Sequence, residues 1–139
     1  MRPTAPSKNT VNVYTCRLFS QQTTPEAVTV DFKEVKKATT DNKTLLVDVR
    51  EPDEVKEYGK IPNSINIPLG NVTTALSTMS EKDFKQTYGK PKPTEDTPII
   101  FYCMIGKRSG KAQQNAINLG FKNAKNYLGS FNDWASKNQ

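Results

Sequence analysis

Residues 99–109 read Ile-Ile-Phe-Tyr-Cys-Met-Ile-Gly-Lys-Arg-Ser, and the segment changes character at its cysteine. The four residues before that cysteine are β-branched or aromatic, which is typical of a buried strand. After Ser109 the apolar residues recur every three or four positions until Gly120, as on one face of a helix. The pattern therefore predicts a strand over 99–102, a loop that begins at Cys103, and a helix over 109–119.

Short apolar segments and amphipathic segments alternate through most of the rest of the chain. Four more strands are predicted, at residues 28–30, 45–49, 65–67 and 126–128. Further helices are predicted after Asp31, from Pro52 to Gly59, over 72–79, over 80–88 and from Ser130 onward. Strands that alternate with helices favour an α/β fold built on a mainly parallel sheet.

Length and charge limit the classes of protein to which this chain can belong. With 139 residues it has room for one domain with a core. No apolar run is long enough to cross a bilayer, so we expect no membrane partner. Half of the net charge of +6 comes from Arg2, Lys8 and Arg17, and the remaining basic residues form no stripe. We therefore expect no nucleic-acid partner either.

The N-terminal segment, residues 1–24, is basic, rich in Ser and Thr, and free of Asp and Glu. This composition is typical of a mitochondrial leader, and Arg17 to Ser20 is typical of the end of one. The alternative is a disordered tail without a targeting role, in which case the protein would be cytoplasmic. The segment contains Cys16, to which we assign no chemistry. One domain is expected over residues 25–139.

The chain has two cysteines and no histidine. Two distant cysteines do not resemble a disulfide framework, so a reducing compartment is expected. Without histidine there can be no Ser-His-Asp triad, Cys-His pair or His-ligated metal site. We predict no cofactor and no bound metal. A nucleophile in this protein must be activated in another way.

Cys103 stands at a position where a thiolate can be stabilised without a side-chain base. A helix that begins soon after a strand directs free N–H groups and the positive end of its dipole at that point. Gly106 allows the loop to curl so that successive amides converge, and Lys107 and Arg108 supply cations. The alternative is that Cys103 only fills space at a strand end, as buried cysteines often do. Two cations in the same turn favour the reactive thiolate.

Four segments, taken in their order and spacing, resemble the single-domain rhodaneses. Residues 103–108, Cys-Met-Ile-Gly-Lys-Arg, resemble the six-residue active-site loop of that family. Residues 46–51, Leu-Val-Asp-Val-Arg-Glu, and 61–68, Ile-Pro-Asn-Ser-Ile-Asn-Ile-Pro, resemble two of its other segments, and Tyr127 to Trp134 resembles its closing motif. The resemblance implies a rhodanese-like fold, in which helices cover both faces of a five-stranded sheet.

The resemblance also implies a function, a thiosulfate sulfurtransferase that carries sulfur as a persulfide on Cys103. Backbone amides of Met104, Ile105, Gly106, Lys107 and Arg108 would hold the terminal sulfur. The expected partners are a small anionic sulfur donor and a thiol acceptor such as glutathione, or cyanide in an assay. The Gly-Lys-Arg form of the loop is similar to that of the small enzymes that use glutathione.

Residues outside the loop are given supporting roles. Asp48 and Arg50 are second-tier candidates, which we expect to brace the edge of the sheet beneath the loop rather than to react. Lys60 replaces a common histidine of the family, and Ser130 replaces the second glycine of its closing pair. We expect neither replacement to touch the nucleophile.

Two other functions compete with this assignment. A cysteine phosphatase or arsenate reductase has a similar Cys-to-Arg-Ser loop, but with five residues between cysteine and arginine, whereas this chain has four. The other competitor is a rhodanese-fold module that only binds partners or senses sulfur, which the fold alone does not exclude. The sequence leaves open the physiological donor and acceptor, cleavage of residues 1–24, and the oligomeric state.

Overall fold

The computed structural model describes residues 29–137. The leader predicted over residues 1–24 and Cys16 lie outside the described residues. The described chain contains, in order, β2 (Thr29–Val30), α2 (Phe32–Ala38), β3 (Leu45–Asp48), α3 (Pro52–Tyr58), β4 (Ser64–Asn66), the 3-10 turn η1 (Leu69–Asn71), α4 (Val72–Ser77), α5 (Glu81–Tyr88), β5 (Ile99–Tyr102), α6 (Lys107–Asn118), β6 (Ala124–Tyr127) and α7 (Ser130–Lys137).

The strands form one five-stranded sheet in the order β2-β6-β5-β3-β4. Every neighbouring pair is parallel. β5 lies in the middle, and its register on β3 pairs Leu45 with Ile99 and Asp48 with Tyr102. Because all strands run in the same direction, their carboxyl ends meet at one edge of the sheet, where α/β proteins usually bind ligands.

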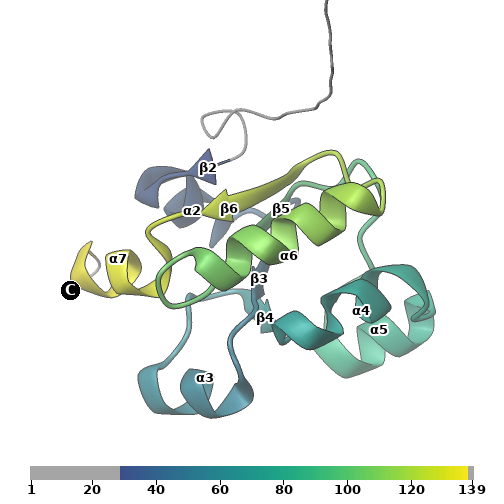
Figure 1. Ribbon diagram of the computed structural model, residues 1–139, viewed down its shortest axis with the longest axis horizontal. Helices are drawn as coiled ribbons and strands as arrows, with labels where there is room; N and C mark the ends of the chain where they lie inside the picture. The colour runs from purple at the N-terminus through teal and green to yellow at the C-terminus, as the bar shows by residue number, and fades with distance from the viewer. Residues whose placement is uncertain (1–28, 138–139) are drawn as a thin grey trace, which may run out of the picture.

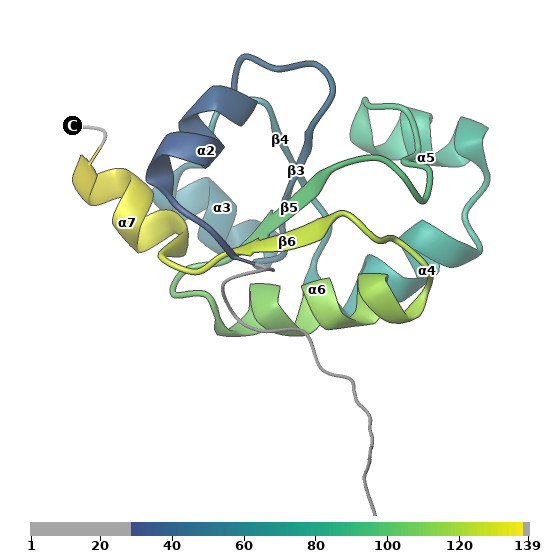
Figure 2. The same cartoon turned by 90° about the horizontal axis from the view of Figure 1, so that it is seen from above.

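Helices cover both faces of the sheet, as Figures 1 and 2 show. On one face α4, α5 and α6 bury Leu76, Phe84 and Ala112 against Ile99 and Phe101 of β5. On the other face α2 and α7 pack on the alternate strand residues, which include Leu46, Ile100 and Tyr102. A strand buried on both faces has a continuous run of apolar residues, which explains the sequence of β5.

The mainly parallel five-stranded α/β fold is confirmed, and several predicted boundaries differ from the structure by one or two residues. α6 begins at Lys107, two residues earlier than predicted, because Gly106 in a left-handed conformation ends the loop there. β6 begins at Ala124 rather than at residue 126, because the polar, partly buried Lys125 interrupts the apolar pattern at its start. α4 ends at Ser77 instead of residue 79.

Candidate functional site

The loop between β5 and α6 lies at the carboxyl edge of the sheet, directly after its central strand. The first turn of α7 holds the start of this loop from the other side. The N–H of Phe131 donates to the carbonyl of Cys103 at 2.9 Å, and the N–H of Asn132 donates to that of Met104 at 3.1 Å. The backbone of the cysteine is therefore fixed by both β5 and α7.

Gly106 determines the shape of the loop. Its φ angle is 98°, in the left-handed region that favours glycine. A Cβ atom at this position would lie 2.3 Å from the carbonyl oxygen of Leu128, well inside contact distance. In this conformation the Gly106 N–H points back at Cys103 and donates to its Sγ at 3.1 Å. Only glycine fits here without a shift of backbone.

The Cys103 sulfur is buried, with a relative exposure of 1% for the residue, and is surrounded by hydrogen-bonding groups. Besides the Gly106 amide, the Ser109 hydroxyl lies 3.5 Å away and the Ser130 hydroxyl 3.9 Å away. Burial alone would raise the pKa of the Cys103 thiol. Hydrogen bonds from the Ser109 side chain and from the amides of Ser109, Gly106 and Ile105 outweigh burial and lower that pKa below its ordinary value.

The expectation that Ser130 does not touch the nucleophile is wrong. Its hydroxyl accepts the N–H of Cys103 at 3.1 Å and donates to the carbonyl of Tyr127 at 2.7 Å. Ser130 is buried and has a φ of 54°, the backbone conformation that a glycine would adopt easily. The residue keeps that conformation and adds a hydroxyl beside the cysteine. A polar residue in place of a glycine was the signal for this contact.

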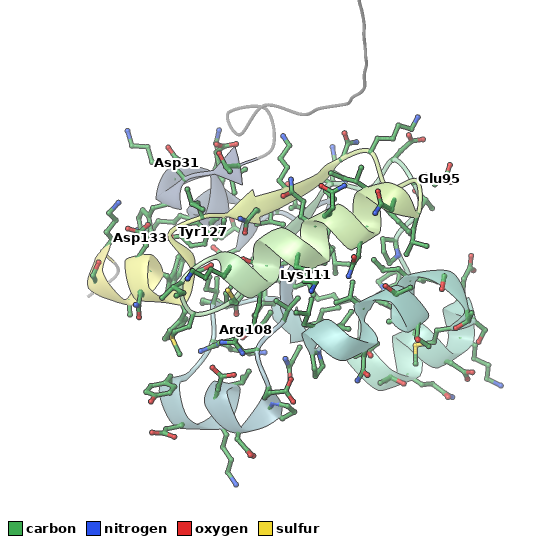
Figure 3. All side chains as sticks on the ribbon, viewed as in Figure 1. Asp31, Glu95, Arg108, Lys111, Tyr127 and Asp133 are labelled. Carbon is green, nitrogen blue, oxygen red and sulfur yellow. The ribbon has the colours of Figure 1, made fainter. Side chains whose placement is uncertain are left out.

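The two cations of the loop both lie in the first turn of α6, and they have different surroundings. The Arg108 guanidinium forms a bidentate ion pair with Glu54 of α3, with Nη1–Oε1 at 2.6 Å and Nη2–Oε2 at 2.9 Å. In Figure 3 the Arg108 side chain extends from α6 toward α3. Lys107 has no ion-pair partner among residues 29–137. The pair with Arg108 lowers the pKa of Glu54 to about 2.

Glu54 is a residue of the site that the sequence reasoning missed. Glu51 precedes α3, and the Glu51 N–H donates to a carboxylate oxygen of Glu54 at 3.1 Å in a capping box. This i, i+3 spacing of two acids around a proline was visible in the sequence as a helix start. It gave no sign that the second acid would reach across to α6.

Asp48 and Arg50 form a buried ion pair beneath the site, with Nη2–Oδ2 at 2.6 Å. The Arg50 guanidinium also donates to the carbonyl of Gly59 at 2.7 Å and stacks over the Phe131 ring, 4.5 Å from its centroid. It therefore connects the end of β3, the end of α3 and the start of α7. Neither side chain is in hydrogen-bond contact with the Cys103 sulfur.

A pocket of about 580 Å³ opens over Cys103 between the loop and α3. Its floor is formed by residues 103–105 with Lys107 and Arg108, and its α3 wall consists of Asp53, Glu54, Glu57 and Tyr58. Within the described part of the chain no group of three His, Cys, Asp or Glu side chains could hold a metal ion. In the same part, no helix is long and apolar enough to cross a bilayer.

Comparison with known proteins agrees with this geometry. The family model described as "Rhodanese-like domain" matches residues 31–137. The "Thiosulfate sulfurtransferase RDL2, mitochondrial" of Saccharomyces cerevisiae is 43% identical over 96 residues, which are 69% of this chain and 63% of that protein. The human "Thiosulfate:glutathione sulfurtransferase" is 36% identical over 112 residues, which are 80% of this chain and 96% of that protein.

Among solved structures, the human single-domain sulfurtransferase TSTD1 superimposes with a TM-score of 0.73 at 34% identity. The match covers 80% of this chain and 97% of that one. The family model and the human relative each cover most of the described domain, including the loop after β5. The chain belongs to the rhodanese family.

Proposed function

We propose that the protein is a thiosulfate sulfurtransferase that moves sulfane sulfur from thiosulfate to a thiol such as glutathione, or to cyanide in an assay, through a persulfide on Cys103. One observation carries the proposal. The Cys103 sulfur sits under a pocket and receives the Gly106 N–H at 3.1 Å, in a loop whose hydrogen bonds lower the thiol pKa. A stabilised thiolate is the nucleophile that this chemistry requires.

The reaction runs in two displacements. In the first, the Cys103 thiolate attacks the outer sulfur of thiosulfate, a bond forms between the two sulfurs, and sulfite leaves with the electron pair of the broken S–S bond. In the second, an acceptor thiolate attacks the outer sulfur of the persulfide, and Cys103 leaves as a thiolate. No proton has to be transferred in either displacement, which is compatible with a site that has no histidine.

The loop residues have distinct roles in this scheme. Amides from Met104 to Arg108, of which that of Gly106 donates to Sγ at 3.1 Å, would hold the terminal sulfur anion as an oxyanion hole holds oxygen. Lys107 attracts the dianionic donor, because it is free of other ion pairs in the described chain. Arg108 contributes less charge to the donor, since Glu54 neutralises it at 2.6 Å. Its main role is to fix α6 against α3.

The test follows sulfite release from thiosulfate with glutathione as acceptor. The wild type and Cys16→Ser should release sulfite, and Cys103→Ser should release none. After thiosulfate alone, intact mass should rise by one sulfur atom, located on the peptide that contains Cys103. Turnover in Cys103→Ser would overturn the proposal.

The same measurements separate the competing functions. Hydrolysis of a phosphate ester without sulfite release would favour a phosphatase. A Cys103 that gains no sulfur, in a chain that releases no sulfite, would favour a binding or sensing module. The loop argues against the phosphatase, because four residues between Cys103 and Arg108 form a smaller ring than a tetrahedral phosphate needs.

We also propose that glutathione is an acceptor and that the protein is mitochondrial. The human relative is named for glutathione and the yeast relative for mitochondria, and residues 1–24 have the composition of a leader. Sulfite release should therefore rise with glutathione more than with an equal concentration of cyanide. A tagged full-length chain should colocalise with mitochondria and become diffuse when residues 1–24 are deleted.

A further inference from the structure

Ser109 directly follows the two cations of α6, and its side chain contacts the Cys103 sulfur. Its hydroxyl oxygen is 3.5 Å from Cys103 Sγ and 2.6 Å from Asn126 Oδ1. The side chain is fully buried, so water does not compete for it. A serine hydroxyl has a single proton, so it can donate to only one of these two acceptors at a time.

Asn126 is held in an orientation in which it competes with the Cys103 sulfur for the hydrogen bond of the Ser109 hydroxyl. It lies on β6, is 5% exposed, and its Nδ2 donates to the carbonyl of Gly106 at 3.3 Å. Because the amide nitrogen must face that carbonyl, Oδ1 must face Ser109, and Oδ1 can only accept. Gly110 leaves room for this arrangement, since a Cβ there would be 3.4 Å from Nδ2.

We propose that the Ser109 hydroxyl donates its hydrogen bond to the Cys103 sulfur whenever that sulfur is a thiolate. When the sulfur is uncharged, the hydroxyl donates to Asn126 Oδ1 instead. Ser109 is thereby a catalytic residue that contacts the reacting atom, and Asn126 is a positioning residue that acts through it. The inference rests on the proposed persulfide function and adds residues that the loop motif does not contain.

The charge on Sγ changes in opposite directions in the two displacements. In the persulfide Sγ is a neutral divalent sulfur and a weak acceptor, so the Ser109 hydroxyl donates its hydrogen bond to Asn126 Oδ1. When the acceptor thiol removes the outer sulfur, the electron pair of the S–S bond returns to Sγ. The hydroxyl then rotates to Sγ and stabilises it as a leaving group, an interaction present in the transition state and absent from the persulfide.

Ser130 does not duplicate this role. Its hydroxyl donates to the carbonyl of Tyr127 at 2.7 Å and is farther from the sulfur, at 3.9 Å. The charged groups around the site are kept constant in every variant below. They are the residues that line the pocket, Lys107 and Arg108 on α6 and Asp53, Glu54 and Glu57 on α3, together with the buried Asp48–Arg50 pair at the end of β3.

The first test compares the two displacements in Ser109→Ala. Persulfide discharge to glutathione in a single turnover should slow about tenfold, because a hydrogen bond to a charged leaving group is lost. Persulfide formation from thiosulfate, expressed per thiolate, should be unchanged or faster, because a thiolate with one hydrogen bond fewer is a better nucleophile. Ser77→Ala, which changes an exposed serine at the end of α4, is the matched control.

The second test titrates the thiolate by its ultraviolet absorbance, with the Cys103→Ser spectrum subtracted so that only Cys103 contributes. Ser109→Ala should raise the pKa of the Cys103 thiol. Asn126→Leu should lower it, because the competing acceptor is gone. In the double variant the effect of Asn126→Leu should vanish, because no hydroxyl remains to be released. Asn126→Ala replaces Asn126→Leu if the leucine variant does not fold.

The inference is supported if Ser109→Ala and Asn126→Leu shift the pKa of the Cys103 thiol in opposite directions, and if Ser109→Ala slows only the discharge of the persulfide. It is overturned if Ser109→Ala leaves the thiol pKa unchanged, slows both displacements equally, or if Asn126 substitutions retain their effect without Ser109. These results differ from a failure of the proposed function, in which the wild type itself would gain no sulfur on Cys103.

Discussion

Replacement of Gly106 by alanine should damage both the stability and the activity of the protein. Alanine at a φ of 98° costs about 1–2 kcal/mol, part of which is offset by the lower entropy of the unfolded chain. The new methyl group would also lie 2.3 Å from the Leu128 carbonyl oxygen, and relief of that overlap requires a backbone shift that costs about 1–3 kcal/mol more. The total loss of unfolding free energy is therefore about 2–4 kcal/mol.

The hydrogen bonding of the Cys103 sulfur should weaken at the same time. Any shift that separates residue 106 from Leu128 also moves the amide that donates to Sγ at 3.1 Å. Sulfite release should fall by at least about tenfold, the effect of one lost hydrogen bond to a charged sulfur. Urea denaturation and the thiosulfate assay measure the two effects separately.

Gly89→Ala is the matched control for this experiment. Gly89 has a φ of 78°, but a Cβ there would meet nothing within 4 Å, so its replacement carries the conformational cost without the overlap. It should lose about 1 kcal/mol and keep full activity. If Gly106→Ala were no less stable than Gly89→Ala and released sulfite at the wild-type rate, the reasoning about the loop would be refuted.

Three further predictions concern charged groups. Glu54→Gln should cost about 0.5–1 kcal/mol at neutral pH, since the pair with Arg108 is partly exposed. Because the pKa of Glu54 falls from 4.5 to about 2 on folding, this stabilisation is complete above about pH 4.5 and is lost as the pH falls toward 2, which acid titrations of the wild type and the variant would show. Arg50→Met should cost about 3–5 kcal/mol in urea denaturation, because it leaves Asp48 buried and unpaired; a cost below 1 kcal/mol would mean that the pair does not brace the site. Alkylation of Cys103 by iodoacetamide should reach its plateau at a lower pH than alkylation of an unstructured cysteine, since the pKa of this thiol is lowered. Equal pH profiles of alkylation for the two cysteines would contradict the proposal that the loop stabilises the thiolate.

Most of the fold could be predicted because its determinants are local. β3 and β5 are continuous apolar runs, and a strand buried on both faces has this pattern wherever it occurs. The start of β6 was harder to locate, because the polar Lys125 interrupts the apolar pattern there, and Asn126 faces the site from inside the strand. A polar residue within a strand has no distinctive signal until its partner, here Ser109, is known.

The site could be predicted only in part for a related reason. The loop from Cys103 to Arg108 is contiguous, so its spacing is visible in the sequence. Glu54 and Asn126 reach the loop from elements that are 54 and 20 residues away from their partners in the chain. Contacts of this kind depend on the packing of α3 and β6 beside α6, which no single segment encodes.

The arrangement around Cys103 suggests why its thiol pKa is lowered by hydrogen bonds rather than by a strong positive charge. In this reaction the same sulfur must attack in one displacement and leave in the other. A thiolate of very low pKa leaves easily but attacks poorly, and one of high pKa is scarce at neutral pH. Arg108, which could have lowered the pKa strongly, is instead neutralised by Glu54 at 2.6 Å. The amides of the loop, together with the Ser109 hydroxyl that we propose alternates between Asn126 and the sulfur, stabilise the thiolate without that charge, and this serves both displacements.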